Sequence, residues 1–130
     1  MESLYSDIDK ARALETLLSI DETLSQLEEW NKSVKSSEDY CDSPGGMQLL
    51  AATCMLLTAI GEGINRIKRS LPEFLESTYP DIPWKAIVGM RNHIAHGYFE
   101  LDAEIVYETV STNIPSLHDA IKEAISELKH

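Results

Sequence analysis

The sequence has few cysteines, few basic residues and no basic, apolar leader. Cys41 and Cys54 are its only cysteines, too few and too isolated for a disulfide framework, and neither stands in a zinc-binding spacing. We therefore expect two free thiols. No apolar run approaches the roughly 20 residues that cross a bilayer, and the first residues lack the features of a signal peptide. These absences predict a cytoplasmic chain without membrane contact.

The basic residues number 11 against 22 acidic ones, which gives a net charge of -11. Because nonspecific affinity for nucleic acid comes largely from neutralised phosphates, this balance excludes a broad basic surface for RNA. A local positive site remains compatible with it, and its candidates are Arg66, Lys68, Arg69, Lys85 and Arg91. An acidic exterior also suits a basic protein partner, or serves only to solvate the outer faces of helices.

Hydrophobic residues make up 43% and charged residues 25% of the chain, as in an ordinary globular protein. The length of 130 residues predicts one domain over 1–130. Apolar residues recur at three- and four-residue steps, and no segment alternates convincingly with period two. We predict helices over about 6–34, 44–70 and 83–97 and from about 102 onward. The fold class predicted is all-α, an antiparallel bundle of four to five helices.

Local signals set the limits and contacts of these helices. Ser43 and Asp102 are predicted N-caps, and residues 33–46 have the composition of a loop. Gly61 and Gly63 permit close approach of another backbone. Pro115 predicts a kink or brief break just before it in the last helix. On the first helix we expect an apolar face that contains Ile8, Ala11, Leu14, Leu17, Leu18, Leu24 and Leu27.

The segment with the most chemical content contains Arg91, His96 and Tyr98, at offsets of five and two, with the polar Asn92 after the arginine. Arginine binds phosphate oxygens with a planar fork, histidine transfers protons near neutral pH, and tyrosine presents a modifiable hydroxyl. On a regular helix, five residues leave Arg91 and His96 roughly 140° apart. We therefore expect the helix to end at Gly97, which would let the two side chains converge.

With its surroundings, this segment resembles the signature of HEPN-domain ribonucleases, and specifically of HepT-like toxins. The resemblance covers about residues 47 to 121, and the first helix carries no specific signature. Its main motifs are Ile60–Glu62, Tyr79–Trp84, Gly89–Asn92 and His96–Tyr98.

The resemblance implies a homodimer in which the motifs of both chains line one cleft and cleave RNA without a metal or cofactor. Arg91 would neutralise charge at phosphorus, His96 would act as general acid and base, and Asn92 would orient Arg91 or the phosphate. The products would be a 2′,3′-cyclic phosphate and a 5′-hydroxyl. The partner implied is an MntA-like nucleotidyltransferase antitoxin, which would transfer AMP to Tyr98 and repel RNA.

Other interpretations remain open from the sequence. Arg91 is also suited to a helix cap or to an ion pair with Glu62 or another carboxylate. His96 is suited to partial burial at a helix C-terminus, and Tyr98 to ordinary turn packing. A noncatalytic HEPN module that binds nucleotide or a partner protein is the alternative function, and a purely structural bundle is a third. His93 and His96 have the spacing of a metal pair, but no third ligand is visible, so we predict no metal site. His118 is predicted to lie on the surface.

Overall fold

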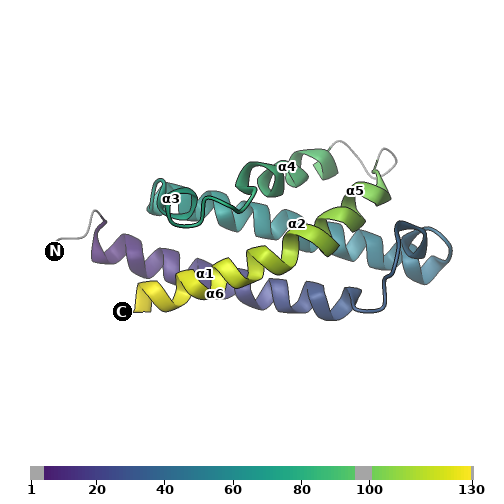
Figure 1. Cartoon of the computed structure of the whole chain (residues 1–130), viewed down its shortest axis with the longest axis horizontal. Coiled ribbons are helices and arrows are strands. Elements are labelled where there is room, and N and C mark those ends of the chain that lie inside the picture. Colours follow the sequence, from purple (N-terminus) through teal and green to yellow (C-terminus); the bar gives the residue numbers. More distant parts are fainter. Residues whose placement is uncertain (1–4, 96–100, 130) are drawn as a thin grey trace.

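The computed structural model describes residues 5–95 and 101–129, and this part of the chain is helical with no strand. In chain order the elements are α1 (Asp7–Asn31), η1 (Ser37–Tyr40), α2 (Pro44–Ser70), α3 (Phe74–Thr78), α4 (Trp84–Ala95), α5 (Ala103–Glu108), η3 (Thr109–Asn113) and α6 (Ile114–Lys129). The two longest helices, α1 and α2, lie side by side and run antiparallel (Figure 1). Helix α6 packs on α1, and α4 packs on α2. The predicted all-α bundle is confirmed.

The ends of the long helices follow the predicted caps. The Ser43 hydroxyl accepts a hydrogen bond from the backbone N–H of Gly46 at 2.9 Å, and the Asp102 carboxylate accepts one from Glu104 N–H at 2.9 Å. Each bond satisfies one of the first N–H groups of a helix, which have no partner within the helix. Near Pro115 the chain forms η3, a π-helical segment between α5 and α6. The predicted interruption before Pro115 is thus confirmed, as a widened turn.

The buried face of α1 differs in part from the prediction. Leu17, Leu24 and Leu27 are buried as expected. Ile8 and Leu18, however, are 66% and 44% exposed. Leu18 points outward because it follows Leu17 directly, about 100° around the helix from the face that meets the core. The two apolar side chains therefore belong to the surface.

The close approach predicted at Gly63 is confirmed where α1 crosses α2. A Cβ atom at Gly63 would lie 2.8 Å from Cγ1 of Ile20, well inside normal contact distance. A side chain at this position would displace Ile20 of α1, so the glycine leaves room for that side chain where the two helices pack.

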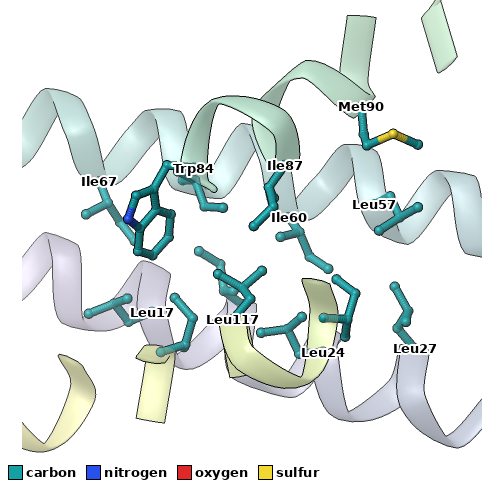
Figure 2. Packing of buried hydrophobic residues seen from close by; sticks show 14 of the residues in the cluster. Leu17, Leu24, Leu27, Leu57, Ile60, Ile67, Trp84, Ile87, Met90 and Leu117 are labelled. Atoms are coloured by element: carbon teal, nitrogen blue, oxygen red, sulfur yellow. The ribbon is translucent and has the colours of Figure 1, made fainter. Parts of the chain in front are cut away.

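Helix α2 corrects the prediction about membrane spans. By length and composition alone, α2 is long and apolar enough to cross a membrane. In the bundle it lies between α1 and α4, where Leu57, Ile60 and Ile64 are buried in the common core (Figures 1 and 2). Its apolar character is accounted for by packing on two sides.

The segment predicted as a loop over 33–46 contains η1 and carries a buried polar network. The Tyr40 hydroxyl donates to Oδ1 of Asn31 at 2.5 Å, and Nδ2 of Asn31 donates to Oγ1 of Thr53 at 3.0 Å and to the Leu27 carbonyl oxygen at 2.9 Å. Burial raises the pKa of Tyr40 to about 12. Because no buried side-chain donor or acceptor of the network in the described residues lacks a partner, its hydrogen bonds offset the cost of burying these polar groups and fix η1 against α1 and α2.

Both cysteines are free thiols, as predicted. Cys41 is exposed after η1, whereas Cys54 lies in the core on α2. Burial raises the pKa of the Cys54 thiol to about 11, because the thiolate would lose its hydration there.

The prediction that His118 lies on the surface is wrong. His118 is only 6% exposed, at the contact of α6 with α1. Its Nε2 lies 2.8 Å from Oδ1 of Asp21, and its Nδ1 pairs with the carboxylate of Glu28. One ring thus faces two carboxylates, and a ring protonated at both nitrogens donates to both. The three side chains, here called the α1–α6 ion cluster, join the first and last helices.

Candidate functional site around Arg91

Helix α4 is held on the bundle by one apolar face. Trp84, Ile87 and Met90 are spaced three residues apart and are buried against α2, as Figure 2 shows. The indole N–H of Trp84 also donates to the Tyr79 carbonyl oxygen at 2.9 Å. Arg91 follows the buried Met90 directly and lies at the border of this face, beside α2.

Arg91 forms an ion pair with Glu62 of α2. Its Nη1 donates to Oε1 of Glu62 at 2.7 Å, and the two side chains are 35% and 49% exposed. The sequence interpretation that Arg91 pairs with Glu62 is confirmed. Arg91 has no further side-chain partner within the described part of the chain, so its other N–H donors remain accessible to an anion. The pair holds the arginine in place without using all of its donors.

Gly61, next to Glu62, lets α2 and α4 approach each other at this point. A Cβ atom at Gly61 would lie 3.6 Å from Cβ of Arg91 and 3.8 Å from Cα of Val88. Side chains longer than a methyl group would push the two helices apart. The predicted close approach at Gly61 is confirmed, and it places Arg91 beside its carboxylate.

The other predicted site residues are only partly placed. Asn92 is exposed on α4 and makes no side-chain hydrogen bond with described residues. His93 accepts a long hydrogen bond, 3.4 Å, from the backbone N–H of Asp102. His96, Gly97 and Tyr98 lie outside the described residues. Their convergence with Arg91, and the end of the helix at Gly97, stay predictions.

The predicted local positive site is weaker than its sequence suggested. Lys68 lies 3.9 Å from the carboxylate of Glu76, and Arg91 is neutralised by Glu62. Arg66 and Arg69 are exposed on α2, and neither forms an ion pair with a described residue. Lys85 of α4 is likewise exposed without an ion pair among the described residues, so the unpaired positive charge of these candidates comes from Arg66, Arg69 and Lys85.

Comparison with known proteins adds an independent observation. A family model described as "Ribonuclease HepT-like" matches residues 20–124. The candidate RNase TTE0752 of Caldanaerobacter subterraneus subsp. tengcongensis is 33% identical over 94 residues, which are 72% of this chain and 78% of that protein. A candidate ribonuclease HepT of Thermococcus cleftensis is 29% identical over 98 residues, 75% of this chain and 82% of that protein. No solved structure shows a significant match.

The helical bundle with Arg91 on its motif helix defines a protein of the HEPN type. The chain belongs to the HepT-like ribonuclease family, because the family model spans most of its length and the relatives agree with it. The resemblance predicted from the sequence is confirmed. Membership supports a ribonuclease function in general terms.

Proposed function

We propose that this chain is a metal-independent endoribonuclease and the toxin of a HepT/MntA-type toxin-antitoxin system in the cytoplasm. The observation that supports the proposal most directly is the placement of Arg91. It is held by Glu62 at the edge of α4 with N–H donors still accessible, as a phosphate-binding arginine needs. Family membership adds ribonuclease chemistry to this anion site.

In the proposed reaction, His96 takes the proton of a ribose 2′-hydroxyl, and the 2′-oxygen attacks the adjacent phosphorus. The bond from phosphorus to the 5′-oxygen breaks, and that oxygen receives a proton from His96 of either chain of a homodimer. Arg91 neutralises the charge that develops on the phosphoryl oxygens, and Asn92 orients Arg91 or the phosphate. The products are a 2′,3′-cyclic phosphate and a 5′-hydroxyl.

Purified protein is expected to cleave single-stranded RNA in the presence of EDTA, because no step uses a metal. The ends of the fragments identify the reaction: the 3′ fragment should accept phosphate from polynucleotide kinase directly, and mass spectrometry should detect the cyclic phosphate. RNA that contains 2′-O-methyl groups should resist, since it lacks the nucleophile. Cleavage of that methylated RNA, or loss of all activity in EDTA, would contradict the proposal.

Tyr98 is proposed as the point of control. An MntA-like nucleotidyltransferase would transfer AMP from ATP to its hydroxyl and release pyrophosphate, and the added phosphate would occupy Arg91 and repel RNA. We expect mass spectrometry to detect AMP on Tyr98 after coexpression with such a partner, together with loss of cleavage. A Tyr98→Phe variant should stay unmodified and stay active. An unmodified Tyr98 in inhibited protein would show that inhibition works by another route.

The alternative function, a noncatalytic module that binds nucleotide or a protein, is favoured by the net charge of -11. The two functions differ in vivo. Expression of an endoribonuclease toxin should arrest growth, and Arg91→Ala should relieve the arrest. A binding module should cause no arrest in either form.

A further inference from the structure

A groove between α1 and α2 opens on the surface next to the Arg91–Glu62 pair. Its volume is about 550 Å³. The side chains that line it are mostly polar, and Glu62 is one of them, so the groove leads to the carboxylate that holds Arg91. The lining residues that matter for its chemistry are Arg12, Ser19, Glu62 and Arg66, with Glu15 as a second acidic residue.

Arginine is concentrated at this groove. The chain has four arginines, at positions 12, 66, 69 and 91. Arg12 and Arg66 line the groove from opposite helices, and Arg91 is tied to it through Glu62. Neither Arg12 nor Arg66 has an ion-pair partner among the described residues. In a chain with 22 acidic and 11 basic residues, two unpaired arginines across one groove favour binding of an anion there.

We propose that the groove binds the backbone of single-stranded RNA next to the cleaved bond, with Arg12 and Arg66 each contacting a phosphate. This inference rests on the proposed ribonuclease function and names residues that hold its substrate. From Arg12 to Thr23 the α1 side of the groove extends about 16 Å at 1.5 Å per residue, which matches roughly five nucleotides of a stacked strand at about 3.4 Å each.

The acidic residues at the groove restrict where RNA can bind, because they repel phosphates that do not reach an arginine. Glu15 repels a strand that approaches α1 one turn away from Arg12, whereas Glu62 is neutralised by Arg91. The exposed Ser19 hydroxyl adds a neutral donor on the α1 side. RNA affinity should therefore depend on a few phosphate contacts and respond only moderately to salt.

The test uses the full chain and a short, fluorescently labelled 2′-O-methyl RNA that the proposed reaction cannot cleave. Binding is followed by fluorescence anisotropy from 50 to 200 mM salt. For a single strand, each lost phosphate contact should lower the slope of log K against log salt by about 0.7, so the salt-induced loss of affinity shrinks about two- to threefold. Arg12→Ala and Arg66→Ala should each show this change, and the double variant about twice the change in slope. Lys122→Ala is the matched control, because Lys122 is an exposed basic residue of α6 that does not line the groove.

The outcomes of this experiment distinguish a failure of the groove proposal from a failure of the proposed ribonuclease function. If unsubstituted protein cleaves RNA but Arg12→Ala and Arg66→Ala bind like Lys122→Ala, the groove proposal is wrong and the ribonuclease function stands. If unsubstituted protein neither binds nor cleaves RNA, both fail. If the groove variants instead change the oligomeric state in sedimentation, the groove is a contact between copies of the chain and the proposal is overturned.

Discussion

Arg91→Ala is expected to lower the rate of RNA cleavage about 10²- to 10³-fold, the usual effect of removing one donor that stabilises transition-state charge. His96→Ala should lower it by about 10²- to 10⁴-fold, as for a lost general acid or base. Both effects should fall mainly on kcat, because the groove arginines would still bind the strand. The measurement is the initial rate of cleavage of a labelled RNA under saturating conditions.

The Arg91 result can be separated from any effect on folding. The Arg91–Glu62 pair is substantially exposed, so its loss should cost no more than about 1 kcal/mol of stability. Thermal melts of Arg91→Ala should therefore stay close to those of the unsubstituted protein. Arg91→Lys keeps the charge but loses the planar fork, and it should also cleave slowly. Normal cleavage by Arg91→Ala would remove the arginine from the mechanism.

The parts of the fold that the sequence predicted well depend on short-range rules. Ser43 and Asp102 cap helices because a side-chain oxygen reaches an N–H two or three residues away, a relation visible in the sequence. Gly61 and Gly63 predicted close contacts between helices, because the absent side chain leaves room for α4 beside Gly61 and for Ile20 of α1 beside Gly63. In each case the signal lies within a few residues of its consequence.

The partners across the bundle could be predicted less well. Glu62 was only one of several carboxylates that could pair with Arg91, and the packing of α4 on α2 is what brings the two within 2.7 Å. The network of Tyr40, Asn31 and Thr53 had no signal in the sequence. Its members come from three elements, and their hydrogen bonds form only when those elements meet.

His118 shows most clearly that contacts between distant parts of the chain could not be predicted from the sequence. It follows the buried Leu117 directly and lies at the flank of the apolar face of α6, where periodicity assigns a polar residue to the surface. Its carboxylate partners stand 97 and 90 residues earlier in the chain. A rule that treats histidine as polar cannot detect that α1 supplies a carboxylate for each ring nitrogen.

His118→Leu is expected to destabilise the protein by about 2 to 3 kcal/mol, or several degrees in Tm. Leucine fills a similar volume, so the loss comes from the missing contacts of the ring with two carboxylates rather than from a cavity. It leaves Asp21 and Glu28 beside each other without the ring that bridges them. These carboxylates are 31% and 39% exposed, which lets water compensate in part and keeps the expected loss below that of a fully buried pair. Urea unfolding followed by circular dichroism measures the change.

Two further variants make the interpretation specific. Glu29→Ala removes an exposed carboxylate of α1 whose sole ion-pair partner among the described residues is Lys32, and it should change stability by less than about 0.5 kcal/mol. Adding Asp21→Asn and Glu28→Gln to His118→Leu should recover part of the loss, because the neutral amides no longer repel each other. If His118→Leu unfolds like Glu29→Ala, the α1–α6 ion cluster does not hold these helices together. If the triple variant recovers nothing, the loss comes from altered packing around residue 118 and not from two unpaired carboxylates.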